Sequence, residues 1–134
     1  MKSASAELLP LVSSEHIVIV RRAVRQRAIE LGFSLVEQTK LVTAASELAR
    51  NTILHGGGGE ATIEIITDGF RIGVRLAFED HGPGIANIAQ AMKDGYSTSG
   101  GLGLGLSGAK RLSNDFAITS SPGVGTRVVI TRWK

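Results

Sequence analysis

The sequence contains no cysteine, few aromatic residues and no long apolar run. Aromatic side chains make up 4% of its 134 residues, while 43% of the residues are hydrophobic. The lack of cysteine excludes disulfides, thiolate catalysis and zinc sites built on thiolates. The scarcity of aromatic residues predicts a core of valine, isoleucine, leucine and alanine. No segment approaches the roughly 18 consecutive apolar residues of a membrane helix, and the first residues lack the apolar stretch of a signal peptide. We therefore expect a soluble cytoplasmic protein that does not bind a membrane.

The length and the charge of the chain narrow its class further. A chain of 134 residues is expected to form one domain, residues 1–134, with a core large enough to fold without disulfides. The net charge is +3, and Arg21, Arg22, Arg25 and Arg27 form a basic patch on the first predicted helix. Such a patch is most often a solvated helix face, and it also suits an acidic protein partner or a polyanionic ligand. Because no aromatic residues are interleaved with the arginines, we do not expect a nucleic-acid partner.

Hydrophobic periodicity, capping residues and turn signals predict alternating helices and strands. The predicted elements are an edge strand at 7–12, a helix from Ser13-Ser14 to about 31, a helix from 34 to about 55, strands at 61–66 and 71–78, a helix from the glycine run to 113 or 114, and strands at 116–121 and 126–133. The sharpest signals are the capping box that begins at Ser34 and the hairpin turn at Asp68-Gly69. The pattern predicts an α+β fold, a two-layer α/β sandwich with a mostly antiparallel mixed sheet and its helices on one face.

Glycine is concentrated in one part of the chain. Eight of the 17 glycines lie between positions 82 and 108. Glycine beside an acidic residue and ahead of an amphipathic segment indicates backbone wrapped closely around a nucleotide, although a turn without a ligand fits the segment 100–105 equally well. A Walker loop is excluded because its lysine would come one place late, at Lys110, with no hydroxyl residue after it. A dinucleotide fingerprint is excluded because no strand directly precedes the glycines. The remaining functional interpretation is a glycine loop that begins a helix and holds phosphate oxygens.

Two polar residues on the second predicted helix are candidates for chemistry. Glu47 and Asn51 are one turn apart and point the same way. Taken alone, they indicate a polar face in water. Alternatively, they form the floor of the glycine-bounded pocket, where Asn51 offers its amide oxygen to a Mg²⁺ ion that carries phosphates. Glu47 then accepts a proton from an attacking hydroxyl or orients it.

Asp80 follows the apolar strand that ends at Phe78 and precedes the bend of Gly82, Pro83 and Gly84. Its carboxylate can accept a hydrogen bond from an exocyclic amine, which favours adenine over guanine. The alternative is a turn aspartate that caps its own backbone.

The order of these motifs resembles that of the GHKL ATPases and kinases, which share the Bergerat ATP-binding fold. Residues 47–51 look like the N box of that superfamily, residues 80–84 like its first glycine box and residues 101–105 like its second, while Thr126 matches the position of a hydroxyl near the adenine. The resemblance implies ATP and Mg²⁺ as cofactors, Glu47 as the catalytic base and Asn51 as the metal ligand. The residues implied in ATP binding are Asn51, Asp80, Gly82, Gly84, Gly101, Gly103, Leu104, Gly105 and Thr126.

Within this superfamily, residues 46–51, 79–85 and 94–103 are similar to the bacterial anti-sigma-factor serine/threonine kinases of the RsbT type. The resemblance implies an ATP-dependent protein kinase of a partner-switching pathway that phosphorylates a serine or threonine of a STAS-domain antagonist protein. A PPM-type phosphatase or a sigma factor is implied as a further partner. The alternative is an ATP-responsive switch that binds a partner and has little kinase activity. Residues 86–99 are expected to form a lid over the triphosphate, and Lys93 is the lid's one cationic residue.

Overall fold

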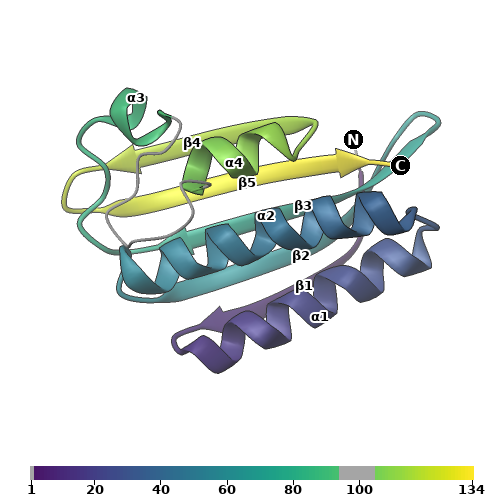
Figure 1. The fold of residues 1–134 in the computed structure, drawn as a ribbon, viewed down its shortest axis with the longest axis horizontal. Helices are drawn as coiled ribbons and strands as arrows, with labels where there is room; N and C mark the ends of the chain where they lie inside the picture. The colour runs from purple at the N-terminus through teal and green to yellow at the C-terminus, as the bar shows by residue number, and fades with distance from the viewer. Residues whose placement is uncertain (1, 94–104) are drawn as a thin grey trace.

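The computed structural model describes residues 2–93 and 105–134, in which five strands form one sheet in the order β1-β2-β3-β5-β4 (Figure 1). The strands are β1 (Lys2–Leu11), β2 (Gly59–Asp68), β3 (Arg71–Asp80), β4 (Asp115–Ser121) and β5 (Gly125–Trp133). The helices are α1 (Ser14–Glu30), α2 (Leu35–Leu54), α3 (Ile88–Ala91) and α4 (Gly105–Arg111). All four pairings between neighbouring strands are antiparallel, whereas a mostly antiparallel mixed sheet was predicted. Helices α1, α2 and α4 cover one face of the sheet, which confirms the predicted two-layer α+β fold.

Helix α2 lies across the middle of the sheet, and its sequence explains its start and its orientation. The Ser34 hydroxyl accepts a hydrogen bond from the Glu37 N–H at 3.1 Å, and the Glu37 carboxylate accepts one from the Ser34 N–H at 3.1 Å. This reciprocal cap satisfies two backbone donors, and the hydrogen bond from the Ser34 backbone is the main cause that lowers the pKa of Glu37. Seven residues at helical spacing are buried against the sheet: Leu41, Val42, Ala44, Ala45, Leu48, Ala49 and Thr52.

The core lies between α2 and the central strand β3. Val74, Leu76 and Phe78 alternate along β3 on the helix-covered face and are buried there. On the opposite face, Arg75 donates a hydrogen bond to Glu64 at 3.0 Å. That hydrogen bond is the main cause that lowers the pKa of Glu64. Asp80 is the last residue of β3, so it lies at the end of the strand, beside the apolar core.

Several element bounds differ from the predicted ones. Strand β1 begins at Lys2, earlier than the predicted 7, because pairing with β2 extends it through residues of low strand propensity. It includes Pro10, which is tolerated because β1 lies at the edge of the sheet. Helix α4 ends at Arg111, before the predicted 113 or 114, and the short helix α3 was not predicted. Among the described residues, the helices are too short or too polar to cross a membrane.

Leu76→Ala tests the position of the core. Leu76 is fully buried, so this substitution removes buried apolar surface and is expected to lower the free energy of unfolding by about 2–5 kcal/mol. Leu35→Ala is the matched control, because the Leu35 side chain is exposed and its loss should change stability by less than about 0.5 kcal/mol. Urea unfolding measures both values. Equal losses from the two substitutions would contradict a core between α2 and β3.

Candidate functional site

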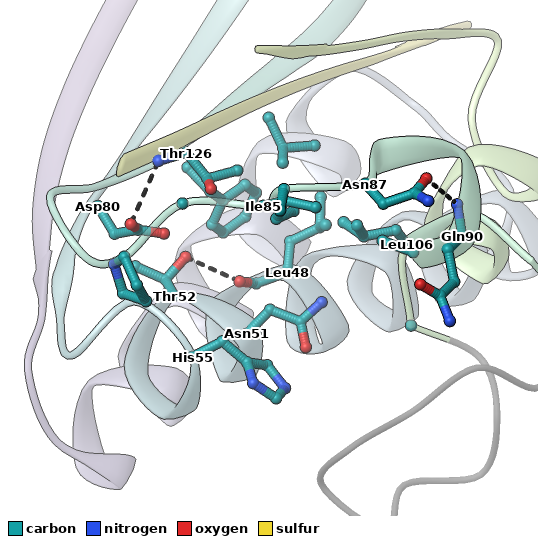
Figure 2. A pocket seen from close by; sticks show the side chains of 17 residues that line it. Leu48, Asn51, Thr52, His55, Asp80, Ile85, Asn87, Gln90, Leu106 and Thr126 are labelled. Atoms are coloured by element: carbon teal, nitrogen blue, oxygen red, sulfur yellow. Dashed lines mark hydrogen bonds between the residues drawn. The ribbon is translucent and has the colours of Figure 1, made fainter. Parts of the chain in front are cut away.

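A cavity of about 400 Å³ opens between α2, the end of β3, the segment that follows it, α3, the start of α4 and β5 (Figure 2). This volume lies within the range of about 300–1,000 Å³ that is typical of small-molecule sites. Its apolar lining comes mainly from Leu48, Phe78, Ile85, Leu106 and Val128. An apolar cavity with polar groups at a few fixed points suits a small, partly polar ligand.

Asp80 is the carboxylate that lines this cavity. It is only 9% exposed, and its Oδ1 accepts hydrogen bonds from the backbone N–H groups of Gly82 at 2.9 Å and Thr126 at 3.2 Å. In the part of the chain that the structure describes, the other oxygen, Oδ2, accepts no hydrogen bond. Two fixed donors thus set the orientation of the carboxylate, and they leave one strong acceptor for a ligand. Asp80 does cap its own backbone through Gly82, so the turn role is present, and this role leaves Oδ2 available for a ligand.

Two glycines make this arrangement sterically possible. A Cβ atom on Gly56 would overlap the carboxyl group of Asp80. The chain after α2 can therefore approach the end of β3 this closely because residue 56 has no side chain. Gly84, which lines the cavity, has a φ of +76°, a conformation that other residues rarely adopt. The sequence marked Gly84 through the motif at 80–84. It offered no sign of the role of Gly56, because the run 56–59 reads simply as a helix stop.

Hydroxyl groups connect the closing hairpin to the cavity wall. The Thr126 hydroxyl lies 2.8 Å from that of Ser120, and the Ser120 Oγ accepts a hydrogen bond from the Ile85 N–H at 2.7 Å. Ser120 was not predicted as a site residue, since it lies in a strand with alternating polarity. These contacts fix Ile85, part of the apolar lining, relative to Thr126 and Asp80.

Asn51 lies in the last turn of α2, four positions before the C-cap residue His55, and both residues line the cavity (Figure 2). On the opposite wall, the Asn87 side chain accepts a hydrogen bond from the Gln90 N–H at 2.9 Å and thereby caps α3. Of these four polar residues, Asn51 was predicted as a site residue, Asn87 and Gln90 fall within the predicted lid, and His55 was not predicted. Residues 86–93 of the predicted lid thus contribute polar groups to the cavity wall, and residues 94–99 lie outside the described residues.

Glu47 is arranged differently from Asn51. It is not among the residues that line the cavity, whereas its neighbour Leu48 is. Its Oε1 forms an ion pair with Arg50 Nη1 at 2.9 Å, and its side chain is 15% exposed. Glu47 therefore lies one turn from Asn51 on α2, as predicted, but its carboxylate is held by an arginine that sequence reasoning did not assign to the site.

The structure brings five of the predicted site residues together around one cavity: Asn51, Asp80, Gly84, Gly105 and Thr126. Gly82 contributes its N–H to Asp80 without lining the cavity. The predictions for Gly101, Gly103 and Leu104 fall outside the described residues.

Comparison with known proteins identifies relatives over most of the chain. Residues 36–134 match the family described as histidine kinase-, DNA gyrase B- and HSP90-like ATPases. The chain is 47% identical to the serine/threonine-protein kinase RsbT of Bacillus subtilis, over 87% of this chain and 88% of that protein. It is 28% identical to an anti-sigma F factor of Clostridium novyi, over 91% of this chain and 89% of that protein. The fold is similar, with a TM-score of 0.63 and 17% identity, to a Mycobacterium tuberculosis protein with RsbU and RsbW domains, and the similarity covers 98% of this chain and 33% of that one.

Asp80→Asn tests the free acceptor oxygen. Asparagine retains one oxygen for the two backbone donors but puts an NH₂ group where Oδ2 stands, so it would oppose the amine of an adenine. We expect ATP binding, measured by calorimetry, to weaken about 10- to 100-fold. The control Asp68→Asn changes an exposed carboxylate at the far turn of β2 and β3 and should bind ATP normally. Unchanged affinity in Asp80→Asn, with the fold intact, would exclude Oδ2 as the acceptor.

Proposed function

This chain belongs to the family of histidine kinase-, DNA gyrase B- and HSP90-like ATPases and is a serine/threonine-protein kinase of the RsbT type, and we propose that its substrate is a STAS-domain protein of a partner-switching pathway. The observation that carries this proposal is the identity of 47% to the RsbT kinase across nearly the whole of both chains. In this proposal the kinase works in the cytoplasm, where ATP is supplied.

In the proposed complex, the adenine of ATP lies against the apolar lining and donates its N6 amine to Asp80 Oδ2. The burial of Asp80 and the two backbone donors on Oδ1 support this orientation. The phosphates then extend past Asn51 toward Gly105, where the described part of the glycine segment begins. The adenine and the phosphates are thus held by different glycine segments.

The residues of the cavity fit a Mg²⁺ ion that arrives with the phosphates. Among the described residues, no group of three or more acidic or histidine side chains could hold a metal. Mg²⁺ in phosphate sites needs only one or two protein ligands, because phosphate and water oxygens supply the rest. The Asn51 amide oxygen suits this role, and bound Mg²⁺ would neutralise charge on the phosphates.

The proposed reaction moves one phosphoryl group to a hydroxyl of the protein substrate. The hydroxyl oxygen bonds to the γ-phosphorus, the bond between that phosphorus and the β,γ-bridging oxygen breaks, and ADP leaves with the electron pair. The hydroxyl proton passes to the Glu47 carboxylate, the proposed general base. The products are ADP, the phosphorylated protein and one proton, so the reaction balances.

The surface of α1 supports a protein partner. Arg21 and Arg22 are exposed and have no ion-pair partner within residues 2–93 and 105–134, and the neighbouring Val18 and Ile19 are exposed apolar residues. Cationic and apolar groups side by side suit an acidic protein surface. Our proposal includes a PPM-type phosphatase or a sigma factor as a further partner of this kind. The similarity to an anti-sigma F factor favours, as the second candidate, an ATP-responsive binding switch with little transfer.

Glu47→Gln tests the transfer step. The amide keeps the size of the side chain but cannot take the proton, so we expect kcat for phosphate transfer to a STAS-domain protein to fall by about 100-fold or more. The dissociation constant for ATP should change by less than about threefold, because the side chain does not line the cavity. Labelled phosphate transfer and calorimetry measure the two quantities.

Glu30→Gln is the control for this variant, because Glu30 is an exposed glutamate that also pairs with an arginine three residues away. It should transfer phosphate at the normal rate. Full activity of Glu47→Gln would rule out Glu47 as the base. A stable complex between the wild-type chain and a STAS-domain protein, with negligible phosphorylation, would favour the binding switch instead.

Asn51→Ala tests the metal ligand. If its amide oxygen binds Mg²⁺, the gain in ATP affinity on adding Mg²⁺ should shrink by about 10-fold, and phosphate transfer should be lost. Titrating ATP with Mg²⁺ and with EDTA measures this gain in the variant and in a control, Asn114→Ala, whose side chain contacts the Trp133 backbone instead. Phosphate transfer that survives in Asn51→Ala would refute the assignment.

A further inference from the structure

The ion pair between Glu47 and Arg50 combines a short contact with a carboxylate that is largely covered. The Glu47 side chain is 15% exposed, compared with 36% for Glu79 and 44% for Asp68 in two other ion pairs of similar length. Glu64 is covered to a similar degree, but it lies on the opposite face of the sheet, away from the cavity. An exposed pair contributes little to stability, whereas a covered carboxylate depends on its partner to offset lost hydration. Arg50 therefore pairs with a carboxylate that is largely covered, which the arginines of the two more exposed pairs do not.

The two oxygens of the Glu47 carboxylate have different environments. Oε1 contacts Arg50 Nη1 at 2.9 Å. Within the described residues, Oε2 accepts no hydrogen bond, and it is not among the fully enclosed polar atoms. One oxygen is thus fixed, and the other is accessible to an incoming group. A general base needs this arrangement, because its acceptor atom has to meet the proton at hydrogen-bond distance.

Arg50 itself is placed to act through Glu47 rather than on ATP. It lies one residue before Asn51 but is not among the residues that line the cavity. Its side chain is 42% exposed, and its contact with Glu47 is its one hydrogen bond to a described residue. A guanidinium group is permanently charged, so this contact to the Glu47 carboxylate persists at every pH at which the glutamate is ionised.

We propose that Arg50 is a positioning residue for phosphoryl transfer: its guanidinium group fixes Oε1 of Glu47 and thereby presents Oε2 to the hydroxyl of the protein substrate. This inference rests on the proposed function, in which Glu47 accepts that proton. Without Arg50, the glutamate side chain rotates more freely and less often meets the hydroxyl. The loss falls on the transfer step and leaves ATP binding intact.

A double-mutant cycle tests the proposal, with Arg50→Met, Glu47→Gln, the double variant and Arg50→Lys compared in phosphate transfer to a STAS-domain protein. We expect Arg50→Met to lower kcat about 10- to 100-fold, the cost of a small misplacement of a reacting group, with KM for ATP unchanged within about twofold. Arg50→Lys should recover part of the rate, since it retains the charge. In the Glu47→Gln background, Arg50→Met should lower the residual rate by less than about twofold, because the two residues act as one unit.

Arg71→Met is the matched control. Arg71 also pairs with a carboxylate three residues away, Asp68 at 2.8 Å, but it lies at the opposite end of β3 from Asp80. The Arg71→Met variant should transfer phosphate at the wild-type rate. If Arg50→Met fails to fold, as judged by circular dichroism, Arg50→Gln takes its place in the same cycle.

Besides an unchanged kcat in Arg50→Met, two results would overturn the proposal. The first is a loss in Arg50→Met that multiplies with that of Glu47→Gln, which would show that Arg50 acts independently of Glu47. The second is a rise in KM for ATP that accounts for the whole effect, which would make Arg50 a phosphate contact.

If the wild-type chain phosphorylates no STAS-domain protein, the proposed function fails by itself, and the cycle is then measured on ATP hydrolysis by the chain alone. Losses in hydrolysis that do not multiply would still support the positioning role, and unchanged hydrolysis in Arg50→Met would overturn it.

Discussion

The shape of the cavity depends on one nearly buried carboxylate and the two backbone N–H groups whose hydrogen bonds it accepts. Burying a carboxylate is costly unless hydrogen bonds replace its hydration, and Asp80 receives these bonds from Gly82, just after β3, and from Thr126 on β5. The absence of a side chain on Gly56 lets the end of α2 approach the same carboxyl group. Three parts of the chain that are distant in sequence therefore meet at Asp80, on the wall of the cavity.

The Glu47 carboxylate on α2 resembles that of Asp80 in how its two oxygens are engaged. In each carboxylate, one oxygen is engaged by fixed protein donors, and the other accepts no hydrogen bond from the described residues. Fixed donors orient an acceptor before any ligand arrives, which lowers the ordering cost of binding or of proton transfer. In the proposed reaction, Asp80 thereby recognises an amine, and Glu47 receives a proton. Because both Glu47 and Asn51 lie on α2, the rigidity of this helix sets the distance between the proposed base and the proposed metal ligand.

Local signals in the sequence predicted α2, the β2–β3 hairpin and the layer arrangement, because capping, periodicity and turn chemistry act over a few residues. Helix periodicity and the turn after β3 also led to Asn51 and Asp80, whereas Thr126 was assigned through the resemblance to the Bergerat-fold proteins. The role of Gly56 was not predictable, since it depends on an approach to Asp80 across 24 positions of the chain. The Glu47–Arg50 contact was missed for another reason: periodicity assigns both residues to the polar side of the helix and cannot tell a covered position from a solvated one. The full length of β1 was missed because pairing with β2, and not its own composition, determines it.

In the proposed complex, Asp80, held by Gly82 and Thr126, recognises the N6 amine of ATP. The most direct measurement is an NMR titration of the amide signals of Gly82 and Thr126 with ATP and, in parallel, with N6,N6-dimethyl-ATP, which has no N6 hydrogen to donate. We expect ATP to shift both amide signals and the dimethyl analogue to bind at least about 10-fold more weakly. Equal binding of the two nucleotides, or amide signals that do not respond to saturating ATP, would contradict the claim.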